Sequence, residues 1–394
     1  MGACCSVNER YDRGLMVEGQ HHDKAMIEVK REDDNAIPSV HSSGAYVRLK
    51  GSSRYISMFS QQGRKGVNQD AMTVWENFNG DKDTFFCAVF DGHGPLGHKV
   101  ARKIRDLLPS TLSSSFNQQP QVNNKAGNND NNAIFSSWKA NLLRSFHDTD
   151  QELRADTSFD TYCSGTTSVS VLKQGDHLVI ANLGDSRAVL CTRDDSDELV
   201  PIQLTVDMKP SLKEEADRIK SKRGRVFAME QEPEVYRIWM PEEDCPGLAM
   251  TRAFGDFCLK DFGLISTPEV SYRKLTERDE FLVIATDGVW DVLSNKEVIE
   301  IVASARKRST VARLLVEYAI LAWRHKYPNL KIDDCAVICL FFKSKPTVVT
   351  KPTSEPSPLK KYSGRPPRPS PKGAKPDHDG LDTVINCEVS ARPQ

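Results

Sequence analysis

The hydrophobic positions of this chain gather in short unbroken runs, several of which meet aspartates at one end. Residues 84–90 read TFFCAVF and stop at the sequence DGHG of residues 91–94. The run FLVIA at residues 281–285 likewise stops just before an Asp-Gly pair, and CAVICLFF at residues 335–342 starts after two aspartates. Runs of this length that are rich in β-branched and aromatic residues predict buried strands, and the glycines predict tight turns at the strand ends.

Aspartates at strand ends place carboxylate oxygens on a rigid frame, which suits hard divalent cations. One Asp-Gly pair is commonly no more than a turn, as Asp379-Gly380 near the end of the chain illustrates. Two such pairs at the ends of apolar strands, at Asp91 and Asp287, with further acids close by, favour a metal site.

Alternating apolar positions in residues 165–193 predict three strands separated by turns at Gly175-Asp176 and Gly184-Asp185. Strands that follow one another this closely must pair antiparallel, because a parallel crossover needs a dozen or more residues. This argues against a doubly wound fold.

Helical spacing of apolar residues predicts four longer helices, at residues 97–108, 134–155, 295–305 and 310–325. The Ser-x-x-Glu spacing predicts capping boxes at Ser211 with Glu214 and at Ser294 with Glu297.

Changes in composition divide the chain into three parts. Residues 1–50 are predicted to be an N-terminal anchor and polar linker, and residues 51–343 the main domain. An asparagine- and glutamine-rich stretch at about 113–133 is predicted to be a flexible insertion, and residues 344–394 a disordered tail rich in proline, lysine and serine. This tail could be phosphorylated, bind a proline-reading module or contact anionic lipid, and an inert tail is an equal alternative.

Composition narrows the classes of protein. With 394 residues, 39% of them hydrophobic, the chain can build one large or two ordinary domains. A net charge of -1 gives no overall drive toward nucleic acid. The 10 cysteines form no CxxC pairs, so neither a zinc site nor a disulfide framework is expected, and a reducing intracellular compartment fits best. No apolar run approaches the roughly 18 to 20 residues that span a bilayer, so we expect no membrane crossing.

The first six residues, MGACCS, fit the pattern for attaching myristate to Gly2. Cys4 and Cys5 lie where a second acyl chain could be added. One myristoyl chain binds membrane only marginally, whereas two signals hold stably. The sequence therefore predicts a lipid anchor, with a chance N-terminal glycine as the alternative, and leaves open whether both cysteines are acylated.

A glycine-bearing turn carries Arg64 and Lys65 and leads to Asp70. Cations beside an acid suit a phosphate next to a metal, although such a turn on its own is commonly just a surface turn.

Taken together, these motifs resemble one family. GRKGVNQDAM, VFDGHG, the block from SGTT to NLGDSRAVL, LAMTRAFGD, ATDGVWDVLSN and DDCAVICLFF occur in the order found in metal-dependent type 2C protein serine/threonine phosphatases, the PPM family, and resemble plant members most. The resemblance covers roughly residues 54–343. It implies an α+β fold in which two packed antiparallel β-sheets are flanked by α-helices, a four-layer sandwich, and the strands and helices predicted above are compatible with it.

The resemblance also implies a metal site. Asp91 matches the carboxylate that bridges two Mg or Mn ions, and the carbonyl of Gly92 matches a ligand of one of them. Asp287 and Asp333 match ligands of the other ion, and Asp70 matches a residue that acts through water.

Further roles follow from the same resemblance. Asp185 and Asp291 match a weaker third metal position, and His93 resembles the proposed general acid. Lys65 lies five residues before Asp70, where many members place a phosphate-binding arginine, with Arg64 one residue away. Either cation could contact phosphate, but a lysine offers no bidentate fork.

Two positions depart from the usual pattern. Gln69 falls where many members have a glutamate, so this chain has no carboxylate at that position, and Asp334 falls where the family usually has an asparagine.

The expected function is hydrolysis of phosphoserine and phosphothreonine in proteins by a water that two metal ions activate. We expect a monomer without nucleic-acid partners, held by lipid at the cytoplasmic face of the plasma membrane, with room for a cytosolic or nuclear pool. The alternative is a catalytically inactive phosphatase fold that binds phosphoproteins at a membrane. A two-metal hydrolase of nucleic acid is disfavoured, because the chain has no basic stripe with interleaved aromatics.

Overall fold

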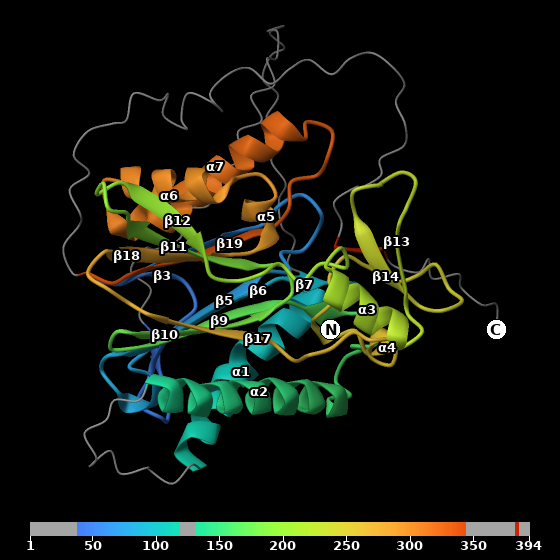
Figure 1. Cartoon of the computed structure of the whole chain (residues 1–394), viewed down its shortest axis with the longest axis horizontal. Coiled ribbons are helices and arrows are strands. Elements are labelled where there is room, and N and C mark those ends of the chain that lie inside the picture. Colours follow the sequence, from blue (N-terminus) through green and yellow to red (C-terminus); the bar gives the residue numbers. More distant parts are fainter. Residues whose placement is uncertain (1–37, 119–130, 344–382, 386–394) are drawn as a thin grey trace, which may run out of the picture. The chain divides into compact units, whose positions relative to one another are not determined.

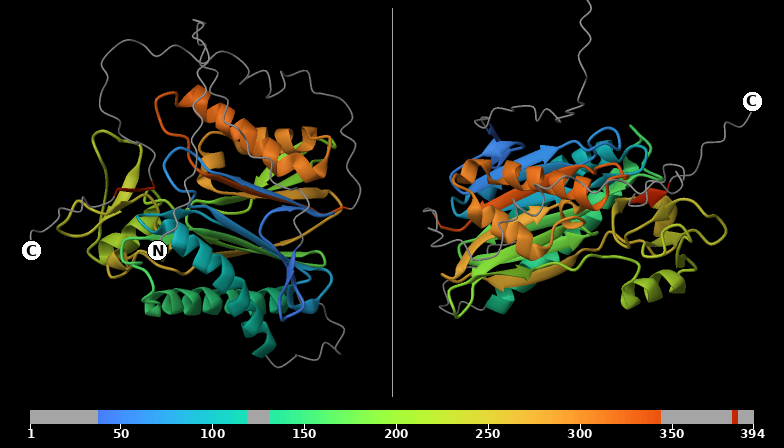
Figure 2. Two further views of the ribbon diagram at one scale, coloured as in Figure 1. Left: turned by 180° about the vertical axis from the view of Figure 1, so that it is seen from behind. Right: turned by 90° about the horizontal axis from the view of Figure 1, so that it is seen from above.

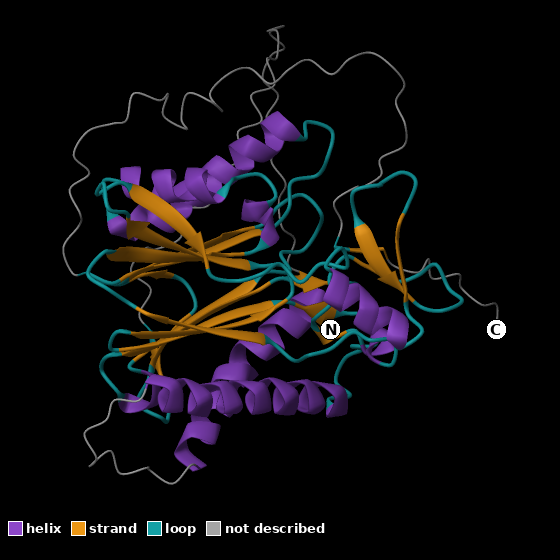
Figure 3. Cartoon of the chain, viewed as in Figure 1, coloured by secondary structure: helices purple, strands orange, loops and turns teal. Residues whose placement is uncertain are grey.

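Two antiparallel sheets packed face to face form the centre of the protein in the computed structural model, which describes residues 38–118, 131–343 and 383–385. Helices α1 and α2 cover one sheet and α6 and α7 cover the other, which gives four layers (Figures 1 and 3). Figure 2 shows the same layers from behind and from above. This is the predicted α+β sandwich, and the fold prediction is confirmed.

The seven strands of the first sheet are, in spatial order, β1 (Ser39–Val40), β2 (Tyr46–Arg48), β5 (Ala71–Glu76), β6 (Thr84–Phe90), β9 (Ser168–Gln174), β10 (His177–Leu183) and β17 (Glu269–Lys274). The six strands of the second are β12 (Leu199–Gln203), β11 (Arg187–Arg193), β18 (Asp279–Ala285), β19 (Cys335–Phe341), β4 (Ile56–Gln61) and β3 (Gly51–Ser52).

Two small sheets lie at one end of the sandwich. One joins β13 (Arg225–Ala228), β14 (Tyr236–Trp239), β15 (Gly247–Leu248) and β20 (Val384–Ile385), and the other joins β16 (Phe254–Gly255), β8 (Gly165–Thr166) and β7 (Gly92–His93). The helices are α1 (Gly97–Gln118), α2 (Asn131–Ala155), α3 (Lys213–Ser221), α4 (Phe257–Lys260), α5 (Asp287–Trp290), α6 (Asn295–Ser304) and α7 (Val311–Lys326), with 3-10 turns η1 (Phe78–Gly80) and η2 (Arg308–Thr310).

Strand β6 shows why the sheets pack as they do. Successive side chains of a strand point to opposite faces, and every residue of β6 is buried. Phe86, Ala88 and Phe90 belong to the core beneath α1 and α2, whereas Phe85 and Cys87 belong to the core between the two sheets. An apolar run without alternation therefore marks a strand that is covered on both faces.

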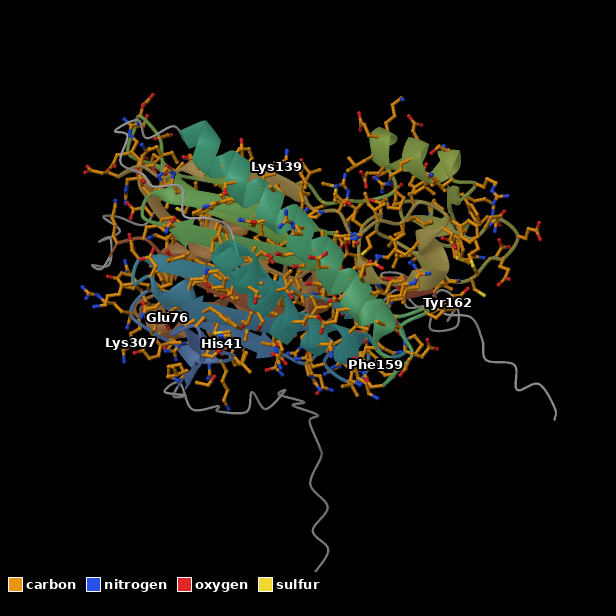
Figure 4. All side chains as sticks on the ribbon, turned by 90° about the horizontal axis from the view of Figure 1, so that it is seen from below. His41, Glu76, Lys139, Phe159, Tyr162 and Lys307 are labelled. Atoms are coloured by element: carbon orange, nitrogen blue, oxygen red, sulfur yellow. The ribbon has the colours of Figure 1, made fainter. Side chains whose placement is uncertain are left out.

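The helical layer beneath the first sheet is amphipathic. Figure 4 looks onto this layer and labels Lys139 on α2, whose ammonium lies 5.9 Å from the ring centre of Phe135. Trp138, Leu142 and Phe146 of the same helix are buried against the sheet. No helix in the described ranges is long and apolar enough to cross a membrane.

Several local predictions need correction. The N-cap of α3 is Leu212 rather than Ser211, and no side chain caps it, so the capping box with Glu214 is wrong. The capping box of Ser294 with Glu297 is confirmed. Strand β11 does not pair with β10, because the Gly184-Asp185 link carries the chain from the first sheet to the second. Spacing along the chain predicted the strands but not which sheet each joins.

The predicted boundaries also shift. Residues 39–48, expected in the linker, add two strands to the first sheet, where β2 pairs with β5. Both ends of the expected insertion at 113–133 are helical, because α1 runs to Gln118 and α2 starts at Asn131. In α1, Ser114 and Ser115 donate their hydroxyls to the carbonyls four residues earlier, which satisfies these polar groups within the helix.

The tail prediction is wrong for one short segment, because residues 384–385 form β20. One cysteine also departs from expectation: Cys245 is disulfide-bonded, whereas the other six cysteines in the described part are free thiols. Gly2, Cys4 and Cys5, where lipidation is predicted, lie outside the described residues.

Candidate active site

Four strands bring carboxylates to the same end of the sandwich. Asp91 directly follows β6, and Asp70 directly precedes β5, which pairs antiparallel with β6 so that Ala71 lies opposite Phe90. In the second sheet Asp287 starts α5 just after β18, and Asp333 lies just before β19, the antiparallel neighbour of β18. Antiparallel pairing thus gathers residues that are far apart in the sequence.

These carboxylates are buried close to one another. Asp70, Asp91 and Asp287 are each at most 8% exposed. Burial raises the pKa of Asp91 well above its ordinary value, and repulsion from Asp287 and Asp70 raises it further. The pKa of Asp70 is raised by burial and by Asp334, and that of Asp287 by burial and by Asp333. Like charges in a buried cluster disfavour ionisation unless a cation joins them.

The residues fit a divalent cation by donor type. All the donors are oxygens, as hard cations require. Asp70 accepts a 2.8 Å hydrogen bond from Thr286 on Oδ2, while its buried Oδ1 has no hydrogen-bond partner in the described structure. Within the same described ranges, no group of three or more His, Cys, Asp or Glu side chains is already arranged to hold an ion.

The two neighbouring aspartates before β19 do different things. Asp334 accepts backbone hydrogen bonds from Gly63 at 2.7 Å and Gln69 at 2.8 Å, one on each oxygen, so it holds the loop before β5. Asp333 instead faces a cation, with one oxygen 2.8 Å from Lys65 Nζ. Asp333 therefore has an oxygen directed toward the site, while both oxygens of Asp334 are engaged by the backbone.

The structure separates the two candidate phosphate-binding cations. Lys65 lines the cavity that contains Asp91 and Asp333. Arg64 is exposed, and it is absent from the residues that line this cavity. Gln69 has a supporting role, because its side-chain oxygen accepts a 2.9 Å bond from the His98 amide.

A second acidic group lies beside the first. Asp185 is 4% exposed, and its Oδ1 has no hydrogen-bond partner in the described structure. Burial raises the pKa of Asp291 to about 6, although the charge of Lys209 opposes this rise. Lys209 Nζ lies 3.6 Å from Asp185 Oδ2, and Asp185 raises the pKa of Lys209. Lys209 belongs to none of the motifs, so it could not be selected from the sequence.

His93 is 3% exposed and lies against a buried acid that the sequence analysis left without a role. Its Nε2 is 2.6 Å from Oδ2 of Asp256, the last residue of the LAMTRAFGD motif. A carboxylate only accepts, so we assign the hydrogen to Nε2. A Cβ on Gly165 would lie 2.0 Å from that Asp256 oxygen, so glycine is required there. The LAMTRAFGD motif marks Asp256 as part of the family pattern, but only the fold shows that Asp256 contacts His93.

The cavity at this site has a volume of about 170 Å³. Its lining combines the loop of Lys65 to Gln69, the DGHG turn and the aspartate pair before β19. Thr383 and Val384, from the C-terminal part of the chain, complete it. Anionic, cationic and imidazole groups therefore meet in one small polar opening, a composition suited to a phosphoryl group with its counter-ions.

Comparisons with known proteins agree with this site. The model of the family described as protein phosphatase 2C matches residues 55–325. A probable protein phosphatase 2C 65 of Arabidopsis thaliana is 50% identical over 357 residues, covering 88% of this chain and 89% of the relative. A probable protein phosphatase 2C 73 of Oryza sativa subsp. japonica is 54% identical over 308 residues, covering 74% of this chain and 73% of the relative.

A solved structure shares the fold. The serine-threonine phosphatase 2C of Toxoplasma gondii superimposes with a TM-score of 0.67 at 24% sequence identity, covering 76% of this chain and 98% of that one. At this identity the likeness concerns the fold alone, whereas the family match and the plant relatives extend over most of the folded chain. The chain belongs to the protein phosphatase 2C family and is a protein phosphatase of that type.

Proposed function

We propose that this protein phosphatase hydrolyses phosphoserine and phosphothreonine in proteins with the help of two Mg or Mn ions. The observation that carries the proposal is the buried cluster of Asp70, Asp91 and Asp287 beside a cavity that also contains Lys65 and His93. Such a cluster needs positive charge to be stable when ionised.

The residues present would hold the ions as follows. Asp91 would contact both ions, with the Gly92 carbonyl on one, and Asp287 and Asp333 on the other. Asp70 would act through water, and its Oδ1 without a hydrogen-bond partner supports that role. When bound, two such ions neutralise charge on the phosphoryl oxygens and lower the pKa of the attacking water.

The protein's own groups would bind and orient the substrate. Lys65 Nζ forms an ion pair with Asp333, and both residues line the cavity. Lys65 would therefore contact an oxygen of a phosphoryl group bound there. His93, protonated on both ring nitrogens, would give its Nδ1 proton to the leaving serine or threonine oxygen, while Asp256 accepts the Nε2–H and fixes the ring. Asp185 and Asp291 would hold a weaker third ion, where Lys209 now supplies the opposing charge.

A substrate panel tests the reaction class. The full chain is incubated with a phosphothreonine peptide, p-nitrophenyl phosphate or a nucleoside triphosphate, with Mn²⁺ or EDTA. We expect Mn²⁺-dependent phosphate release from the peptide and little from the nucleotide. Preference for the nucleotide would replace this proposal with a nucleotide hydrolase, and no release from folded, metal-loaded protein would favour a module that only binds phosphoproteins.

We further propose that the folded domain acts as a monomer at the cytoplasmic face of the plasma membrane, held there by acyl chains on Gly2 and on Cys4 or Cys5. The support is the MGACCS start together with the two-chain requirement for stable anchoring. Membrane fractionation of Gly2→Ala beside the natural chain tests it. A variant that fractionates with membranes as the natural chain does would rule out myristate as the anchor.

A further inference from the structure

The end of the chain forms part of the candidate active site. Strand β20 is the outermost strand of its sheet, antiparallel to β15, with Leu248 opposite Val384. Ala249 donates its amide to the Thr383 carbonyl at 2.9 Å. Figure 2 shows this short red segment at the sheet that also contains the yellow-green strands β13 and β14, with β15 between β14 and β20. Without β20, the outer edge of β15 would present unpaired backbone groups.

This edge leads directly to the catalytic groups. Thr383 and Val384 line the same cavity as Asp91, His93 and Lys65. At about 170 Å³, the cavity is smaller than the roughly 300 to 1,000 Å³ of ordinary ligand pockets. It has room for a phosphoryl group, so the backbone of a protein substrate would lie along its rim, part of which Thr383 and Val384 now form. The wall contributed by the chain end is a separate, short segment.

The contacts of β20 are those an extended peptide would make. A buried guanidinium, that of Arg237, is 3.3 Å from both the Thr383 and the Gly247 carbonyls. Val384 is only partly buried and packs against the apolar cluster that contains Ile238, Leu248 and Met250. Backbone pairing at a sheet edge with one side chain in an apolar pocket is how strand addition recognises peptides.

The residue at the cavity also has the chemistry of the reaction product. Thr383 carries the hydroxyl that remains when phosphothreonine loses its phosphate. Its carbonyl is fixed by Ala249 and Arg237, so it stays beside the cavity while β20 is paired.

We propose that the edge of β15 is the docking site for the extended, phosphothreonine-bearing segment of a protein substrate, and that Thr383–Ile385 occupies this edge as an internal, product-like competitor. The substrate class rests on the proposed function. Only molecules in which β20 has left the edge of β15 then bind a protein substrate. Pairing of β20 with β15 in the remaining molecules therefore raises the apparent KM for protein substrates. A small phosphate ester needs no sheet edge and escapes this effect.

A matched pair of variants at one position tests the pairing. Ala249 and Thr383 form a hydrogen-bonded pair, so the alternation of an antiparallel ladder makes Gly247 and Ile385 another. Ile385→Pro removes the donor from this pair, whereas Ile385→Ala keeps it. We expect Ile385→Pro to lower the KM for a phosphothreonine peptide about five-fold, which corresponds to about 1 kcal/mol for one net backbone hydrogen bond. Ile385→Ala should have a smaller effect.

Truncation after Gly380 should lower this KM at least as much, while p-nitrophenyl phosphate hydrolysis changes less than the peptide reaction. A labelled peptide of the sequence GLDTVIN should bind the truncated chain in fluorescence anisotropy and compete with the phosphopeptide. It should bind the full chain much more weakly.

Two results would overturn the proposal. One is an unchanged or higher peptide KM in both the truncated chain and Ile385→Pro. The other is failure of GLDTVIN to bind the truncated chain, a readout that needs no catalysis and so stands even if the proposed reaction is wrong. Absence of metal-dependent release from every substrate would instead refute the proposed function, while leaving the anisotropy result to judge the docking edge.

Discussion

Glu215 on α3 is predicted to be a strong stabilising contact of the region around the active site. Its carboxylate is 4% exposed and accepts hydrogen bonds from both Arg218 and Arg252, the shortest at 2.6 Å. Thr251 donates to it at 2.5 Å. Thr251 and Arg252 lie just before β16, which leads to Asp256, so this contact connects α3 to the segment that positions His93.

The pKa of Glu215 indicates how much its carboxylate contributes to the free energy of unfolding. Burial acts to raise this pKa, but the hydrogen bonds from Arg252, Arg218 and Thr251 outweigh burial and lower it from 4.5 to about 2. Each pKa unit of difference between the folded and unfolded states corresponds to about 1.4 kcal/mol, so the lowered pKa of Glu215 corresponds to about 3 kcal/mol of folding stability at neutral pH. Because the folded-state pKa is the lower one, the contribution is complete above pH 4.5 and is lost as pH falls toward about 2.

Glu215→Gln keeps the size of the side chain and removes its charge. We expect the free energy of unfolding at pH 7, measured by urea denaturation in EDTA with tryptophan fluorescence, to fall by about 2 to 3 kcal/mol. Glu214→Gln, on an exposed neighbour, should change it by no more than about 0.5 kcal/mol. The difference between wild type and Glu215→Gln should shrink as pH falls below 4.5. Equal effects of the two variants, or a difference that persists down to pH 2, would show that the ionised Glu215 carboxylate does not stabilise the fold.

Three further predictions concern the site. Asp256→Asn should leave the fold intact and lower kcat by about 10- to 100-fold with an altered pH profile of kcat, whereas an unchanged profile would limit Asp256 to a structural role. Because burial and repulsion raise the pKa of Asp91, its ionised form destabilises the metal-free fold. The melting temperature of Asp91→Asn in EDTA should therefore be no lower than that of wild type, and Mn²⁺ should raise it by less. An equal rise in melting temperature with Mn²⁺ would contradict this. Lys65→Met should raise the KM for a phosphopeptide more than Arg64→Met does, and the reverse order would assign phosphate binding to Arg64.

Much of the fold could be predicted because burial is visible in the sequence, as unbroken apolar runs in strands covered on both faces and as helical periodicity in amphipathic helices. The apolar runs of β6, β18 and β19 and the amphipathic pattern of α7 appear at the expected residues. The two Ser-x-x-Glu patterns show the limit of local rules. Ser294 caps α6, but the same spacing at Ser211 fails because α3 begins one residue later than a cap at Ser211 requires. It follows a turn in which the Leu212 amide bonds to the Lys209 carbonyl.

What could not be predicted depends on contacts between distant segments. The residues around Asp256 do not indicate its contact with His93, which is 163 residues away in sequence. Lys209 lies next to Asp185 only because the chain crosses there from one sheet to the other. Strand β20 consists of two residues in a proline- and lysine-rich tail, and such a segment becomes a strand only where an edge like that of β15 accepts it. Asp70, Asp91, Asp287 and Asp333 could be selected from the sequence because each lies within two residues of a strand whose apolar pattern is plain.

The role of the buried carboxylate cluster is tested most directly by phosphate release from a phosphothreonine peptide by the full chain, titrated with Mn²⁺, in wild type, Asp91→Asn and Asp148→Asn. Asp148 lies exposed on α2 and serves as the matched control. We predict saturable Mn²⁺ dependence in wild type and Asp148→Asn, and a loss of at least about 100-fold in kcat for Asp91→Asn. Comparable release by Asp91→Asn, or release that persists in EDTA, would contradict the assignment of the buried carboxylate cluster as the centre of the reaction.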